Sequence, residues 1–122
     1  MTIFSISFFA ILGALTRYYQ SNIVTGLLGK TFPYATMSIN ILGSFLMGFL
    51  FYFTLERLTI SPALRAGVLT GFLGAYTTFS TFSLETYSLV QEGKLLKALT
   101  YGFGSLILGF SGVFLGAALG RR

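Results

Sequence analysis

Cysteine, histidine and tryptophan are absent from the sequence, and only three residues carry a carboxylate side chain. Without cysteine and histidine the chain cannot form disulfides, thiolate metal sites or imidazole proton relays. Three carboxylates also leave few groups for hydrolytic chemistry. Charged residues make up 9% of the 122 residues and hydrophobic residues 54%, a balance too apolar for the surface of a water-soluble domain. The composition therefore indicates a membrane protein and not an enzyme.

Polar residues divide the chain into four apolar stretches, and each is long enough for a helix that crosses about 30 Å of hydrocarbon. The stretches are Thr2 to Val24, Pro33 to Leu55, Pro62 to Val90 and Leu95 to Leu119. The connections between them are too short for another domain. No Lys or Arg precedes the first apolar core, so we interpret it as a retained helix and not a signal peptide. We predict an all-α membrane protein in which residues 1–122 form a single domain of four transmembrane helices.

Positive charge is divided almost evenly between the two sides that four crossings would create. One side collects Arg57, Arg65, Arg121 and Arg122, and the other collects Lys30, Lys94 and Lys97, plus Arg17 if the first helix ends before it. Because such charges normally orient a membrane protein, this chain is predicted to insert in both directions. A single, weakly determined orientation remains the alternative.

Four short helices barely enclose a conduction path, and transporters commonly combine two halves of opposite topology. No internal repeat relates the two halves of this sequence, so a second copy inserted upside down would supply the missing half. Glycines spaced for close helix packing support an antiparallel homodimer: Gly67 and Gly71, and Gly112, Gly116 and Gly120. The same glycines fit packing within one subunit equally well.

The third stretch contains the unusual segment GFLGAYTTFSTFSLE, residues 71–85. Gly71 and Gly74 weaken a helix, and the conformational freedom of Gly74 suits an interruption of the backbone. Hydroxyls from Thr77 and Thr78 can bond to backbone groups in place of the regular ladder. We therefore predict a broken third helix whose released carbonyl groups could hold a small cation.

Beyond this interruption, Phe79 and Phe82 share a helical face while Ser80 and Thr81 point elsewhere. The edge of an aromatic ring is positive, so two rings that present their edges could attract a small anion. Two phenylalanines at this spacing also fit an ordinary core. Glu85 is the only carboxylate within an apolar run, which suggests a pathway or gate, or alternatively a solvated group near a helix end.

Polar residues in the other stretches have both functional and structural interpretations. Asn40 must face protein or water, since an unpaired amide in hydrocarbon costs about 2–7 kcal/mol, and it fits either an ion path or an interhelical contact. Arg17 fits an interfacial anchor as well as a functional role. Tyr101 and Ser105 are one helical turn apart and form either a polar track or a pair of interhelical donors.

The segments GALTR, NILGSFLMG and GFLGAYTTFSTFSLE closely resemble the Fluc (CrcB) fluoride channels, and the four-stretch layout is similar along the entire chain. The resemblance implies an antiparallel, dual-topology homodimer in the plasma membrane, with two pores that export fluoride passively. It also implies fluoride contacts from the ring edges of Phe79 and Phe82, an amide donor at Asn40, and a polar track of Ser80, Thr81, Tyr101 and Ser105.

The same resemblance implies a central structural sodium ion bound by backbone carbonyls of Gly74 and Thr77 from both subunits. It places Glu85 near a pore mouth and Arg17 near the pore entrance. Tyr76 departs from the family pattern, in which a smaller or aliphatic residue is expected beside the sodium. The matches at Tyr101 and Ser105 rest on spacing more than on a distinctive motif.

Two other classes of membrane protein fit parts of the sequence. A small multidrug-resistance exchanger also uses four short helices in an antiparallel dimer, but its chemistry needs a carboxylate in the first helix, and this first helix has none. A membrane subunit that transports nothing would use the polar residues only as helix contacts. Fluoride efflux from liposomes that contain only this protein would separate the three classes.

Overall fold

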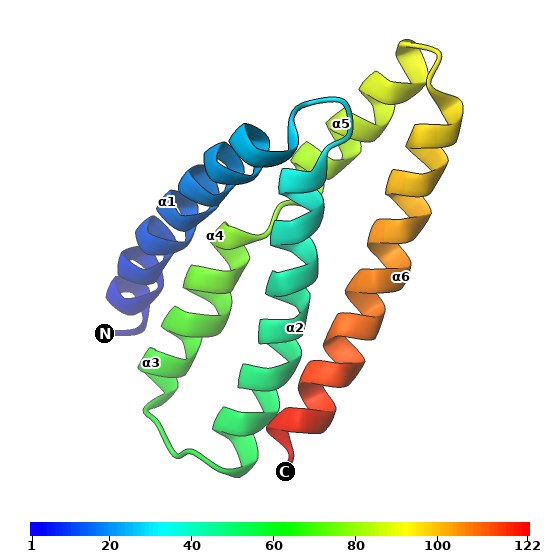
Figure 1. Ribbon diagram of the computed structural model, residues 1–122. Helices are drawn as coiled ribbons and strands as arrows, with labels where there is room; N and C mark the ends of the chain where they lie inside the picture. The colour runs from blue at the N-terminus through cyan, green and yellow to red at the C-terminus, as the bar shows by residue number, and fades with distance from the viewer.

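All regular secondary structure in the computed structural model, which describes residues 1–122, is helical. The elements are α1 (Thr2–Leu28), α2 (Tyr34–Glu56), α3 (Pro62–Ala66), the π-helix η1 (Gly67–Leu73), α4 (Gly74–Tyr76), α5 (Phe79–Gln91) and α6 (Leu95–Gly120). Figure 1 shows α1 and the segment from α3 to α5 running in one direction, and α2 and α6 running in the other. The tight connections after α1 and α5 contain Gly29 and Gly93, which have φ values of 81° and 75°.

Three helices are long and apolar enough to cross a membrane: α1, α2 and α6. They correspond to three of the four predicted stretches, so the chain is a multi-pass membrane protein. α1 continues past its predicted end at Val24 to Leu28. Backbone groups in lipid need hydrogen-bond partners within the helix, so the α-helical hydrogen bonds continue through these less apolar residues. The first helix does not end before Arg17. This residue therefore lies within α1 and is not counted with Lys30, Lys94 and Lys97 on one side of the membrane.

Glycines bring the helices into backbone contact within the single chain. A Cβ atom at Gly116 or Gly120 would overlap the backbone of Phe45 or Phe49 on α2, and one at Gly71 would overlap Ile6 on α1. The residues spaced as GxxxG therefore serve packing within one subunit, which was one of the two alternatives. They fix α6 against α2 and η1 against α1, the two most extensive helix contacts of the chain.

Residues 62–91 are divided into short helices, none of which is long enough alone to cross a bilayer. Helical geometry is lost at Thr77 (φ −80°, ψ 159°) and Thr78 (φ −150°, ψ 114°). The expectation that Gly74 would supply the irregular backbone is wrong, since Gly74 is helical with φ −63° and ψ −37°. The irregular backbone therefore falls on two threonines, and side chains bond to it there, as described below.

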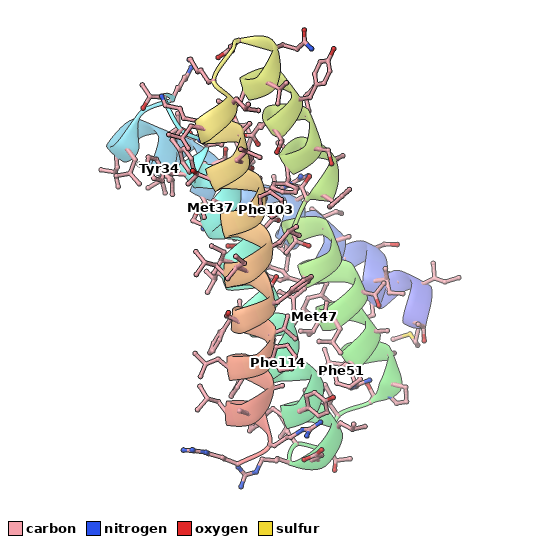
Figure 2. All side chains as sticks on the ribbon, turned by 90° about the vertical axis from the view of Figure 1, so that its right-hand side faces the viewer. Tyr34, Met37, Met47, Phe51, Phe103 and Phe114 are labelled. Carbon is pink, nitrogen blue, oxygen red and sulfur yellow. The ribbon has the colours of Figure 1, made fainter.

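Many large apolar side chains are exposed on the surface, as expected for helices that cross a lipid bilayer. Few side chains are fully buried, and a small core forms around Ile39, Leu69, Leu73 and Tyr76. Large apolar side chains such as Phe103 and Phe114 project from α6 and are 62% and 77% exposed (Figure 2). One copy of the chain thus leaves wide apolar faces for lipid or protein.

Candidate functional site

A cavity of about 340 Å³ lies where α2, α5 and α6 meet. Its lining includes Asn40, Phe79, Phe82 and Ser105, four of the residues that the sequence singled out, and contains no charged residue. We call it the phenylalanine cavity. The ring centroids of Phe79 and Phe82 are 5.9 Å apart, and the Phe82 ring lies 5.1 Å from that of Tyr101 at 63°, an edge-on arrangement. Both phenylalanines line the cavity. Phe79 is 76% exposed, whereas Phe82 also packs against the buried cluster of Leu89, Ala98 and Tyr101, so the core interpretation holds in part for Phe82.

Asn40 contacts the interrupted backbone directly. Its Oδ1 accepts a hydrogen bond from the Thr78 N–H at 2.8 Å, and its Nδ2 donates to the Thr78 carbonyl at 3.0 Å. One N–H of the amide remains outside these two bonds. Asn40 is therefore an interhelical contact in this structure, and it also lines the phenylalanine cavity.

Threonine hydroxyls form hydrogen bonds with backbone groups at both helix ends beside the interruption. The Thr77 hydroxyl donates to the Leu73 carbonyl at 3.0 Å, and the Thr78 hydroxyl accepts from the Thr81 N–H at 3.2 Å, which caps α5. The prediction that these two side chains satisfy local backbone groups is confirmed. The Thr78 and Thr81 hydroxyls are also 3.0 Å apart, which orders the first turn of α5.

The hydroxyls of Tyr101 and Ser105 are buried, and neither has a hydrogen-bond partner within the chain. Both interpretations of this pair, a polar track and a pair of interhelical donors, therefore stay predictions. A buried polar group without a partner costs about 1–3 kcal/mol, so this part of α6 favours an additional polar occupant. Ser105 lines the phenylalanine cavity, whereas Tyr101 is fully buried behind Phe82 and Phe32.

Glu85 lies at a second cavity, of about 440 Å³, between the end of α1, the loop to α2 and α5. Its carboxylate accepts a hydrogen bond from the Thr36 hydroxyl on α2. Thr81, Lys30 and Lys94 line the same cavity. Glu85 is thus a half-buried group in a polar cavity, not a side chain that extends freely into solvent.

Arg17 and Ser80 lie apart from the phenylalanine cavity. Arg17 is half-buried and lines a third hollow, of about 460 Å³, together with Thr36, Thr78 and Thr81. Ser80 is exposed, and its hydroxyl lies 3.4 Å from that of Thr78. Thr78 and Thr81 therefore connect the surroundings of Arg17 with the interrupted backbone.

Gly74 and Thr77 lie on either side of Ala75 and Tyr76, just before and at the interruption. A Cβ atom at Gly74 would meet nothing within 4 Å, so the space beside it is open. Between them Tyr76 is buried, and its hydroxyl donates to Gln20 on α1, which in turn donates to Ser38 on α2 at 3.3 Å. The residue that departs from the family pattern thus anchors the last turn before the interruption.

Sequence reasoning missed Thr36 and Ser44, which belong to the same face of α2 as Asn40. The three residues are spaced four apart, and Ser44 lines the phenylalanine cavity while Thr36 bonds to Glu85. Helical periodicity around Asn40 was the available signal, since residues four apart stack on one face. Nothing in the sequence pattern pointed to the bonds among Tyr76, Gln20 and Ser38, which depend on how three helices pack.

The sequence of this chain is similar to the sequences of a known protein family. Residues 4–117 match the family described as CrcB-like protein, Camphor Resistance (CrcB). This chain belongs to the CrcB family. The CrcB match extends from α1 to α6 and includes every residue that lines the phenylalanine cavity.

Several curated CrcB relatives carry the name "Fluoride-specific ion channel FluC". One from Acidithiobacillus ferrooxidans is 58% identical over 112 residues, which are 92% of this chain and 90% of the relative. One from Methylococcus capsulatus is 49% identical over the whole of this chain but only 54% of its own length. One from Aquifex aeolicus is 39% identical over 98% of this chain and 96% of the relative.

Proposed function

We propose that this chain is a fluoride-specific ion channel of a bacterial plasma membrane, through which fluoride leaves the cell passively. The carrying observation is the uncharged cavity at which Asn40, Phe79, Phe82 and Ser105 meet. The names of its CrcB relatives support the same function.

Neutral groups suit the conduction of a small, strongly hydrated anion. Positive ring edges and amide or hydroxyl donors can replace part of the hydration shell of fluoride. Conduction also requires that the ion leave again, so binding at each position must stay weak. A lysine or arginine in the phenylalanine cavity would hold the anion too tightly, and none lines it.

The hydroxyls of Tyr101 and Ser105 are proposed as further donors along α6, since both are buried without a partner. Ser80 and Thr81 at the start of α5 complete this polar track. Glu85 and Thr36, which line the second cavity, are proposed to lie toward one mouth of the pore, and Arg17, which lines the third hollow, near the entrance. This order follows the direction of α5 from the interruption to its carboxyl end.

The segment of residues 62–91 is proposed as the fourth membrane crossing, broken at Thr77 and Thr78. Figure 1 supports this, because α3 starts beside the lower end of α2 and α5 ends beside the upper end of α6. The interruption lies against α2, where Asn40 and both threonine hydroxyls satisfy its backbone. Irregular backbone at membrane depth is tolerated where protein surrounds it in this way.

The working unit is proposed as an antiparallel homodimer with two pores and a central structural sodium ion. One copy leaves the Phe79 ring mostly exposed and the space beside Gly74 open, so a second copy would complete both surroundings. Backbone carbonyls of Gly74 and Thr77 from each chain would bind the cation. Neutral oxygen ligands suit a monovalent ion such as sodium better than zinc or calcium.

Fluoride efflux from liposomes that contain only this protein tests the proposal. A fluoride-selective electrode should record rapid efflux once a potassium ionophore balances the charge, and a chloride electrode should record almost none. Efflux that requires a proton gradient and an organic cation would favour an exchanger. Absence of any efflux from correctly folded protein would contradict the channel and favour a subunit that transports nothing.

A further inference from the structure

Asn40 holds Thr78 much as a neighbouring β-strand would hold it. Its Oδ1 accepts from the Thr78 N–H at 2.8 Å and its Nδ2 donates to the Thr78 carbonyl at 3.0 Å. A backbone N–H can only donate, so the bond fixes which side of the amide faces Thr78. Thr78 is 8% exposed, and both of its backbone groups are hydrogen-bonded to Asn40.

The first of these bonds takes a donor away from the preceding helix. In a continuous α-helix each N–H donates to the carbonyl four residues earlier, so the Thr78 N–H would bond to the Gly74 carbonyl. The ladder is regular one residue earlier, where the Thr77 N–H donates to the Leu73 carbonyl at 3.1 Å. At Thr78 the donor goes to Asn40. The Gly74 carbonyl therefore loses its α-helical donor, because the Thr78 N–H donates to Asn40 instead.

The threonine hydroxyls cannot replace Asn40 in this role. The Thr77 hydroxyl bonds to the Leu73 carbonyl, and the Thr78 hydroxyl caps α5 through the Thr81 N–H. Neither hydroxyl reaches the N–H or the carbonyl of Thr78 itself. If the Asn40 amide were removed, the nearest way to satisfy the buried Thr78 N–H would be to extend α4 by one residue, which would return Gly74 to the helical ladder.

We propose that Asn40 is the positioning residue of the cation site: it frees the Gly74 carbonyl by binding the Thr78 backbone, and its remaining N–H serves the phenylalanine cavity. This inference rests on the proposed channel function, because it assigns the Asn40 side chain to both the cation site and the anion path. The two sites are then coupled through the interruption. A change that closes the interruption weakens cation binding even where the lining of the cavity is otherwise intact.

Selective isotope labelling gives a direct signal from this position. Thr77 and Thr78 are the only adjacent pair of threonines in the sequence. In protein labelled with ¹³C-carbonyl and ¹⁵N threonine, a carbonyl-to-amide NMR correlation therefore contains a single signal, from the Thr77 carbonyl and the Thr78 amide. That signal reports on a proposed sodium ligand and on the hydrogen bond to Asn40 together.

In the unaltered protein, sodium titration against a large organic cation should shift this signal. In Asn40→Leu, which is close in size but has no polar group, the Thr77 carbonyl shift should move toward the helical range. Its sodium midpoint should rise about tenfold, the effect of losing about one hydrogen bond. Asn40→Asp can still accept from the Thr78 N–H, so its signal should stay nearer to the original position even though an added negative charge reduces fluoride flux.

Phe82→Ile is the matched control, because Phe82 lines the same cavity without bonding to Thr78. It should lose fluoride flux but keep both the signal position and the sodium midpoint. If Asn40→Leu leaves the signal and its midpoint unchanged, or if Phe82→Ile shifts them equally, the inference is overturned. Absence of fluoride flux in the unaltered protein would instead contradict the proposed function, and the NMR result would still decide the role of Asn40.

Discussion

The hydroxyl side chains near the interruption fall into two groups according to what they bond. Those of Thr77 and Thr78 bond to backbone groups within a few residues, so they stabilise the local geometry. Those of Tyr101 and Ser105 are buried and bond to nothing within the chain. Since most buried polar groups in proteins are paired, the second group is the better candidate for contact with a conducted ion.

Phe79 and Phe82 give the most direct prediction at this scale. Replacing either by Ile keeps an apolar side chain but removes the positive ring edge. Fluoride efflux from liposomes should fall at least about a hundredfold, which corresponds to a loss of about 3 kcal/mol of ion stabilisation. Size-exclusion chromatography should show an unchanged oligomer. Phe114→Ile is the matched control, because Phe114 is 77% exposed on α6 and lines none of the cavities described above.

The convergence of Asn40, Phe79, Phe82 and Ser105 could be expected from sequence only in part. Helical spacing indicated that the two phenylalanines share a face and that Tyr101 and Ser105 stack. The contact of Asn40 with Thr78 joins residues 38 positions apart, and no local pattern encodes it. Contacts of this kind depend on the register of one helix against another, which the close approach of glycines determines.

Among the helices, sequence predicted the long apolar spans well because hydropathy alone determines them. It predicted an interruption in residues 71–85 from two glycines and from the hydroxyls of Thr77 and Thr78, and only the threonines lie at the interruption. Glycine lowers helix stability in water, yet Gly71 and Gly74 both remain helical here. Gly71 serves close packing against Ile6, and the interruption follows from the side-chain bonds of Thr77, Thr78 and Asn40.

Packing between α2 and α6 should be sensitive to a single methyl group. In Gly116→Ala the new Cβ would overlap the Phe45 carbonyl oxygen and lie 2.9 Å from the Phe49 nitrogen. Because backbone atoms cannot move aside cheaply, the substitution should destabilise the fold by about 1–3 kcal/mol. Circular dichroism during heating in detergent would measure the lower melting temperature.

Gly102→Ala on the same helix is the control for this prediction. A Cβ atom there would meet nothing within 4 Å, so the melting temperature should stay the same or rise slightly, since Ala favours helix over Gly. Equal melting temperatures for the two variants would mean that the close contact between α2 and α6 contributes little to stability.

For the whole molecule, the near balance of positive charge remains the argument for insertion in both directions. In the loop between α2 and α3, the Ser61 side chain caps α3 by accepting from the Leu64 N–H at 3.1 Å, so a label is better placed at another residue of this loop. Thr59 is exposed in the same loop and makes no side-chain hydrogen bond. In Thr59→Cys, which introduces the chain's only cysteine, an impermeant thiol reagent should label about half of the molecules from each side of the membrane. Complete labelling from one side would exclude a dual-topology dimer.

The proposed sodium ion links the two copies at the centre of the molecule, so its removal should affect the whole channel. Gly74 and Thr77 offer neutral carbonyls, and the space beside Gly74 is open. Two carbonyls from one chain are too few to surround a cation, so the proposed site depends on the dimer. Replacing sodium by a large organic cation on both sides should abolish fluoride efflux slowly, because a buried ion exchanges only when the subunits loosen. Restoring sodium should recover the efflux without any sodium being transported. Full efflux after prolonged depletion, with sodium loss verified by elemental analysis, would contradict the cation site and leave the interruption at Thr77 and Thr78 to serve the anion path alone.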